Sequence, residues 1–432
     1  MIATLLFAVF IITMMLGVPI GASLGLAGAA AIALANAEAP WFGLLAVPQN
    51  FYAGLGKYPL LAIPMFVLVG SIFDRSGVAL RLVNFAIALV GRGPGMLPLV
   101  AICVAMFLGG ISGSGPANAA AVGAVMIAAM NRAGYPASYS ASVVGAAAAT
   151  DILIPPSVAF IVYSVLVPGA SVPALFAAGM IPGVLAGIAL IVPAVWMARK
   201  HGMGHLESSL PRPPLLKSFI EAIWGLAAPV LILGGMRMGW FTPTEAAVVA
   251  VFYGLFVGLF VHRSMTLRDL FPILKESGEL SAVILLVVSL AGIFAFSLST
   301  LGVIDPITRA IVNSGLGEYG VLALLILMLI TIGMFLDGVS IFLIFVPLLW
   351  PIVQHYNWDP VWFGVLLTLK VALGQFTPPL AVNLMVSCRI ANVRMEETVR
   401  WVGPMLLAMG LVMVAVIIWP ELALWLPRVL GY

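Results

Sequence analysis

Residues 109–118 read Gly-Gly-Ile-Ser-Gly-Ser-Gly-Pro-Ala-Asn and join two strongly apolar runs, 96–108 and 119–130. Each run is about 18–20 Å long as a helix, at ~1.5 Å per residue, whereas crossing a bilayer core takes about 20 residues. A polar turn at membrane depth must be covered by protein or line a wet cavity. The stretch therefore predicts a re-entrant hairpin whose tip offers backbone groups, Ser112, Ser114 and Asn118 to a polar ligand. A glycine-lined contact between two ordinary spans is the alternative.

The composition is that of a membrane protein. Of 432 residues, 63% are hydrophobic and 8% are charged, and the mean hydropathy is +1.19. Apolar runs recur from end to end, so we expect one all-α polytopic membrane unit without a separate soluble domain. The net charge of +3 comes from basic loops and argues against a nucleic-acid partner.

Lys and Arg orient the predicted elements, because cytoplasmic loops carry an excess of both residues. The first hairpin, over about 96–131, is flanked by Arg92 and Arg132 and is expected to enter from the cytoplasm. A second hairpin is expected over about 321–353, around Leu336-Asp337-Gly338. It has no adjacent Lys or Arg, so it is expected to enter from outside. The two tips should point at each other.

An internal repeat relates the two halves of the chain. The pairs Pro155-Pro156 and Pro378-Pro379 lie 223 positions apart, and the same offset separates Ser114 from Asp337. Each half is read as a hairpin followed by a broken span, in opposite orientations. This is the inverted-repeat plan of secondary transporters.

The repeat sets the expected boundaries. The first repeat is expected over 1–200, a cytoplasmic linker over 201–218 and the second repeat over 219–432. Broken spans are expected over about 137–166 and 360–388, and a closing span is expected to end near 426.

The broken spans carry the predicted chemistry. Proline lacks an N–H and obstructs the preceding turn, so an interrupted span leaves backbone carbonyls without partners. Such carbonyls near Ile154 and Pro156, with the serine hydroxyls of the first tip, suit a hard cation. Helix N-termini at the same depth favour an anion. A plain kink at each proline pair is the structural alternative.

Three ionisable residues fall at membrane depth, where a charge costs roughly 2.5–3.5 kcal/mol and usually serves function. Asp151 is expected to face the first set of carbonyls. Asp337 either binds a ligand or caps the second arm of its hairpin. Lys370 is expected to be a counter-ion or to snorkel toward the membrane surface.

Four motifs resemble the large membrane subunit of tripartite ATP-independent periplasmic (TRAP) transporters. They are Gly-Ile-Ser-Gly-Ser-Gly-Pro-Ala-Asn-Ala-Ala-Ala (110–121), Ile-Leu-Ile-Pro-Pro-Ser (152–157), Phe-Leu-Asp (335–337) and Phe-Thr-Pro-Pro-Leu-Ala-Val-Asn-Leu (376–384). The resemblance covers essentially the whole chain. It implies an elevator-type transporter in a bacterial inner membrane, driven by sodium, with a separate small four-helix subunit and a periplasmic solute-binding protein. The implied substrate is an organic anion, commonly a carboxylate.

The resemblance also implies site residues, with two or more sodium ions. One sodium site would use Ser112, Asp151, Ile154 and Pro156, with Ser114 nearby; the other would use Gly333, Gly374, Thr377 and Leu380. Substrate contacts are assigned to Ser112, Asn118, Asp337 and Asn383. Many members carry glycine where Asp151 stands, so Asp151 either adds a carboxylate to the site or marks a changed use of ions.

Two other functions compete with this interpretation. A stand-alone sodium/dicarboxylate elevator symporter would share the hairpins and repeats but need no binding protein. An intramembrane serine hydrolase would use the Gly110-Ile111-Ser112-Gly113 sequence as its nucleophile. A nucleophilic serine needs a base, but all four histidines fall in loops or at helix edges, so only Lys370 could serve. We therefore disfavour the hydrolase and expect no enzymatic activity.

Overall fold

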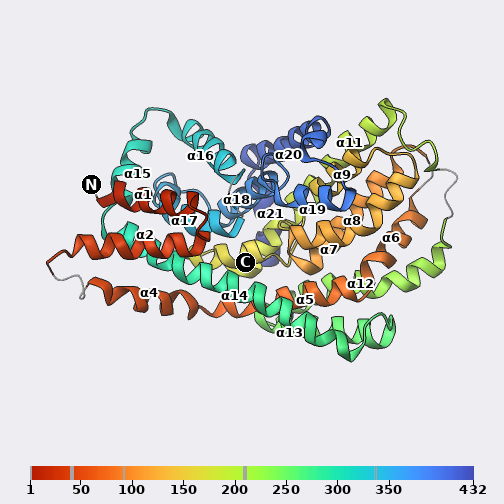
Figure 1. Cartoon of the computed structure of the whole chain (residues 1–432), viewed down its shortest axis with the longest axis horizontal. Helices are drawn as coiled ribbons and strands as arrows, with labels where there is room; N and C mark the ends of the chain where they lie inside the picture. Colours follow the sequence, from red (N-terminus) through yellow and green to blue (C-terminus); the bar gives the residue numbers. More distant parts are fainter. Residues whose placement is uncertain (1, 39–42, 91–92, 208–211, 335, 337) are drawn as a thin grey trace.

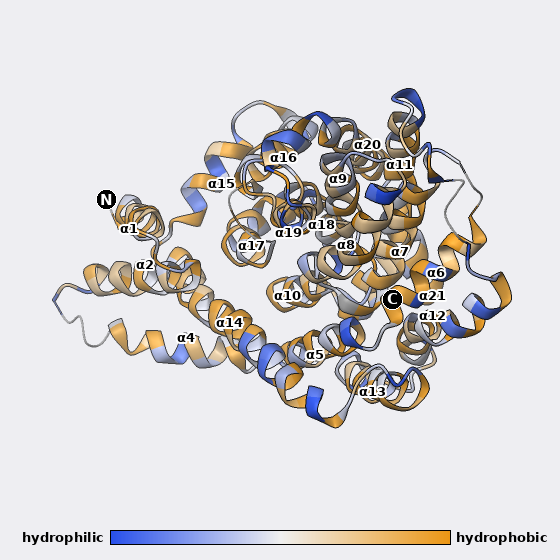
Figure 2. Cartoon of the chain, turned by 45° about the vertical axis from the view of Figure 1, so that its right-hand side comes forward, coloured by the Kyte–Doolittle hydropathy of each residue, from blue (hydrophilic) through white to orange (hydrophobic). Residues whose placement is uncertain are grey.

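The computed structural model describes residues 2–38, 43–90, 93–207, 212–334, 336 and 338–432, apart from the side chain of Ser112. Every regular element in these ranges is a helix, and seven are long and apolar enough to cross a membrane. The all-α prediction is confirmed. Hydrophobic residues make up most of the helical ribbon, and hydrophilic residues gather mainly at helix ends and connections (Figure 2).

The first half of the chain ends with a long helix. Its elements are α1 (Ile2–Met15), α2 (Ile20–Ala35), α4 (Ala46–Leu55), the 3-10 helix η1 (Tyr58–Leu61), α5 (Ala62–Arg75), α6 (Val78–Leu89), α7 (Met96–Ser112), α8 (Gly115–Arg132), α9 (Ala137–Ala148), α10 (Val158–Leu166) and α11 (Val172–Lys200).

The second half follows a polar connection. Its elements are α12 (Leu215–Arg237), α13 (Pro243–Phe256), the π-helix η3 (Val257–Val261), α14 (Leu267–Thr300), α15 (Ile304–Val312), α16 (Gly317–Gly333), α17 (Gly338–His355), α18 (Pro360–Gly374), α19 (Val382–Ala391), the 3-10 helix η4 (Met395–Thr398), α20 (Val399–Ile418) and α21 (Glu421–Leu430).

Two hairpins stand at corresponding places in the two halves. In the first, α7 and α8 meet at Gly113, whose φ of +60° suits glycine. The arms are 17 and 18 residues long, so they extend beyond the apolar runs. The small residues of the tip continue the helices, and Pro116 stands in the first turn of α8, where no N–H is needed. The second hairpin is formed by α16 and α17.

Both predicted interruptions lie at the paired prolines. Residues 149–157 separate α9 from α10, and residues 375–381 separate α18 from α19. The broken helices of the first half pack against the second half: α9 contacts α19, and α10 contacts α17. The 34-residue helix α14 runs past α2, α4, α5 and α17 (Figure 1).

Two expected boundaries are wrong. The linker does not reach residue 218, because α12 begins at Leu215, directly after Pro213-Pro214. The closing span does not continue to 426, because α20 ends at Ile418 and Pro420 precedes a separate helix, α21. Proline cannot supply the N–H that would continue α20.

A buried carboxylate fastens the base of the first hairpin. Glu207 is 7% exposed; its Oε1 accepts the Leu97 N–H at 2.9 Å, and its Oε2 accepts the Tyr135 hydroxyl at 2.6 Å. The Tyr135 hydroxyl in turn accepts the Gly95 N–H at 2.7 Å. A carboxylate at the N-terminus of α7 also offsets its positive end. Glu207 therefore holds the connection after α11 against the first hairpin.

Replacing Glu207 with Ala should lower the free energy of unfolding by about 2–3 kcal/mol, because two buried donors lose a charged acceptor.

Burial raises the pKa of Glu207 above its ordinary value of 4.5. The folded state then binds the proton more tightly than the unfolded state, so the contribution of Glu207 to stability falls as the pH rises from about 4.5 through its raised folded-state pKa. Thermal unfolding across pH should show this trend in the wild type and less of it in Glu207→Gln. Glu396→Gln, at an exposed carboxylate, serves as the control, and equal pH profiles for the wild type and Glu207→Gln would contradict the prediction.

Candidate functional site

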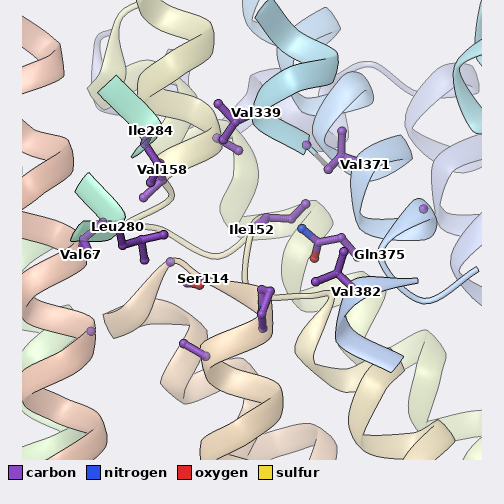
Figure 3. A pocket seen from close by; sticks show the side chains of 18 of the residues that line it. Val67, Ser114, Ile152, Val158, Leu280, Ile284, Val339, Val371, Gln375 and Val382 are labelled. Carbon is purple, nitrogen blue, oxygen red and sulfur yellow. The ribbon is translucent and has the colours of Figure 1, made fainter. Parts of the chain in front are cut away.

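A cavity of about 530 Å³ lies where the two hairpin tips meet the two helix interruptions (Figure 3). Helices α5 and α14 supply another wall, through Val67, Leu280 and Ile284 among others. Residues from both halves of the chain therefore line one space. From the tips and interruptions, the lining residues include Gly113, Ser114, Gly115, Ile152, Gly333, Gly338, Val371, Gly374, Gln375, Leu380 and Val382.

Helix ends of both polarities open into this cavity. The first residues of α8, α10, α17 and α19 line it, namely Gly115, Val158, Gly338 and Val382. A helix N-terminus carries roughly half a positive charge and free N–H groups, which favours an anion. The last residues of α16 and α18 also line it, and helix C-termini offer carbonyl oxygens to cations. The cavity can therefore hold an anion and a cation close together.

Two members of the first predicted cation set, Asp151 and Pro156, lie against the end of α7. A Cβ atom at Gly113 would lie 2.6 Å from the Pro156 carbonyl oxygen, and one at Gly109 would lie 2.9 Å from Asp151 Oδ1. Asp151 is fully buried. The oxygens of Asp151 and Pro156 are thus held against the C-terminal turn of α7, where glycine permits the approach. Oxygen atoms of this kind suit a hard cation.

The other members of this set are placed differently. Ser114 lines the cavity. The Ile154 side chain points toward α11, where it packs on Gly183. Ser112 ends α7, and its side chain lies outside the described residues.

The second predicted set joins the second hairpin to the second interruption. A Cβ atom at Gly374 would lie 2.8 Å from the Gly333 carbonyl oxygen, so the backbones of α16 and α18 touch there. Leu380 lines the cavity. Thr377 does not, and its Oγ1 donates to the Leu373 carbonyl at 2.6 Å.

The expectation that Lys370 snorkels is wrong, because the residue is 1% exposed. Its Nζ contacts the position that a Gly333 Cβ would take. Among the described residues, Nζ has no hydrogen-bond partner. The buried Lys370 side chain therefore occupies the space directly beside Gly333 in this set.

Neither of the two predicted substrate asparagines, Asn118 and Asn383, forms part of the cavity surface. Asn118 is buried between the arms of the first hairpin, where its Nδ2 donates to the Ala105 carbonyl at 2.8 Å. Asn383 donates through Nδ2 to Gln375 Oε1 at 3.0 Å and lies behind the lining residues. Asp337 lies outside the described residues.

Sequence reasoning missed four polar lining residues: Ser71, Asp74, Glu276 and Gln375. Glu276 pairs with Arg75 at 2.9 Å across α5 and α14, with both side chains partly exposed. The sequence features that could have identified these lining residues are weak. Gln375 directly precedes the motif at 376–384, and Asp74 ends an apolar run. Only the packing of α5 and α14 against the hairpins brings Ser71, Asp74 and Glu276 to the cavity.

The chain matches one family model along nearly its whole length. Residues 7–422 match the model described as "Tripartite ATP-independent periplasmic transporter, DctM component". The chain is 34% identical to the C4-dicarboxylate TRAP transporter large permease protein DctM of Rhodobacter capsulatus, over 99% of each chain. It is also 34% identical to the sialic acid TRAP transporter large permease protein SiaM of Vibrio cholerae, over 96% of each.

Two further similarities are of other kinds. The chain is 36% identical to the isethionate TRAP transporter permease protein DctMQ of Oleidesulfovibrio alaskensis, and the match spans 94% of this chain but 63% of that relative. The crystal structure of the Alcanivorax borkumensis YdaH transporter superposes with a TM-score of 0.58 and 14% identity, over 90% of this chain and 91% of the other. That likeness concerns the fold.

Proposed function

This chain belongs to the DctM-component family of tripartite ATP-independent periplasmic transporters, and from this premise we propose that it carries an organic anion with a carboxylate group into the cell, coupled to a sodium gradient. One observation carries the proposal: helix N-termini and helix C-termini meet at a single cavity between the hairpin tips. Relatives named for C4-dicarboxylates and sialic acid, which are carboxylates, support the substrate class. Family membership sets the serine hydrolase alternative aside.

The proposal includes partners and a location. A small four-helix membrane subunit would accompany this chain in a bacterial inner membrane, and a periplasmic binding protein would deliver the substrate. The relatives named large permease proteins support a division into subunits. The lipid bilayer would surround the apolar outer surface.

The first oxygen set is the better candidate for sodium. Asp151 and the Pro156 carbonyl provide hard oxygen ligands, and their positions against α7 tie the ion to the tip of the first hairpin. The Lys370 side chain fills space beside the second set, around Gly333 and Gly374. A bound sodium ion would supply positive charge next to the anion and about 2.3 kcal/mol of driving force per 100 mV.

The proposed movement follows from the two walls of the cavity. Hairpin tips and broken helices form one wall, while α5 and α14 form the other. In an elevator mechanism, the hairpin unit would slide along the second wall and carry the ligands between the two sides of the membrane. A cavity between two differently built walls supports such a movement.

Uptake by proteoliposomes tests the proposal. The chain would be reconstituted with its small subunit and assayed with radiolabelled succinate or N-acetylneuraminate, with and without a sodium gradient and the binding protein. We expect uptake that requires both. Uptake without the binding protein would favour a stand-alone symporter, and sodium-independent uptake would exclude sodium coupling.

The same assay tests the role of Asp151. Asp151→Asn keeps the shape of the side chain and removes its charge, so the sodium concentration for half-maximal uptake should rise about tenfold, the equivalent of ~1.4 kcal/mol. Asp305→Asn in the short helix α15 is the matched control and should leave it unchanged. An unchanged sodium dependence in Asp151→Asn would remove Asp151 from the site.

A further inference from the structure

Gln375 is held across the second helix interruption by two hydrogen bonds from one residue. Its backbone carbonyl accepts the Asn383 N–H at 3.0 Å, and its side-chain Oε1 accepts Asn383 Nδ2 at 3.0 Å. Gln375 follows the last residue of α18, and Asn383 is the second residue of α19. The two bonds fix the Gln375 side chain relative to both half-helices.

The first hairpin covers this pair of amides. A Cβ atom at Gly115 would lie 2.6 Å from Gln375 Oε1 and 2.8 Å from the Nδ2 and Oδ1 atoms of Asn383. Glycine at this position lets the tip of one repeat rest on the amide pair of the other. Asn383 is fully buried, so it is shielded from the cavity.

The remaining hydrogen-bonding capacity of Gln375 faces the cavity. Its Oε1 is occupied by Asn383, whereas Nε2 donates no hydrogen bond within the described part of the chain. Figure 3 shows the carboxamide nitrogen turned away from Val382, toward Ile152. A fixed N–H₂ group at the cavity surface is a donor suited to a carboxylate oxygen.

The helix ends near Gln375 complement such a donor, whereas the lining carboxylates Asp74 and Glu276 belong to the wall formed by α5 and α14. Helix N-termini at Gly115 and Val382 flank Gln375. No Lys or Arg side chain lines the cavity within the described ranges. A carboxylate in this space would therefore be recognised by neutral N–H groups, among which Gln375 offers a side chain that substitution can test.

We propose that Gln375 is a specificity-determining residue, which donates its Nε2 hydrogens to the substrate carboxylate, and that Asn383 is a positioning residue, which acts through Gln375. This inference rests on the proposed function and deepens it. It also revises the sequence-based assignment of Asn383 as a substrate contact, because Asn383 orients the group that makes the contact.

Direct binding to the purified complex of large and small subunits tests the inference without the binding protein. Scintillation proximity would report [¹⁴C]succinate binding at saturating sodium, and ²²Na⁺ binding would report the integrity of the cation site. Gln375→Met should raise the Kd for succinate about tenfold while ²²Na⁺ binding stays unchanged, and Gln375→Glu should raise it further by repulsion. Gln354→Met, at an exposed glutamine, is the matched control.

A double-mutant cycle distinguishes contact from positioning. Asn383→Leu should weaken succinate binding, and the double variant with Gln375→Met should bind no worse than Gln375→Met alone. Wild-type binding by Gln375→Met, additive losses, or a parallel loss of ²²Na⁺ binding would each overturn the inference. If the wild type binds neither succinate nor N-acetylneuraminate, the proposed function itself fails.

Discussion

Gly113→Ala is expected to abolish most transport while leaving the membrane helices folded. The left-handed conformation at φ +60° costs an L-residue roughly 1–2 kcal/mol. The new Cβ would also lie 2.6 Å from the Pro156 carbonyl oxygen, so the hairpin tip and the first interruption must move apart. A shift that weakens the transport step by only ~1.4 kcal/mol slows it about tenfold, and we expect at least that loss in sodium-driven uptake.

Gly169→Ala separates the two causes. Gly169 has a φ of +88° but nothing within 4 Å of its Cβ position, so alanine there carries the conformational cost without a collision. Both variants should lose some thermal stability, whereas only Gly113→Ala should lose uptake and ²²Na⁺ binding. Equal uptake by the two variants would show that the contact with Pro156 has no part in transport.

Gly374→Ala is expected to have a similar effect at the second hairpin. Gly374 is the last residue of α18, and alanine would place a methyl group 2.8 Å from the Gly333 carbonyl oxygen. Backbone atoms cannot give way as a flexible side chain can, so α16 and α18 must separate and the cavity must widen. We expect uptake to fall about tenfold or more, the equivalent of at least ~1.4 kcal/mol in the transport step.

The control for Gly374→Ala is Gly403→Ala in α20. Gly403 is helical and has nothing within 4 Å of its Cβ position, so alanine should stabilise the helix by about 0.5–1 kcal/mol. Both substitutions replace a helical glycine and should bring this gain in helix stability. The difference in uptake between the two variants therefore reports the collision with the Gly333 carbonyl oxygen. Normal uptake by Gly374→Ala would contradict a close approach of α16 and α18 during transport.

These glycine contacts explain how the fold serves the site. Each hairpin touches a broken helix through backbone atoms: Gly113 at Pro156 and Gly374 at Gly333. A third contact, Gly115 on the Gln375–Asn383 pair, joins the two repeats. Ligands bound there would contact both hairpins and both interruptions. Binding would therefore affect the positions of both hairpins and both broken helices together.

The sequence alone determined the class, the hairpins and the helix breaks. Its composition requires a polytopic membrane protein, the polar stretch at 109–118 requires a turn between helices, and the paired prolines require interruptions. Those features follow from local chemistry, such as the missing proline N–H, which acts in any tertiary context. The resemblance motifs likewise fall on contiguous residues, so the family could be read from the chain.

Tertiary structure decided which of the polar residues meet. Asn118 and Asn383 look equivalent to Gln375 in sequence, yet packing buries both asparagines and leaves Gln375 at the cavity. Lys370 is enclosed because α18 is covered along almost its whole length, which no hydropathy pattern reveals. The wall formed by α5 and α14 joins residues about 200 positions apart. Such long-range placement depends on the fit of whole helix surfaces, and local sequence chemistry cannot specify that fit.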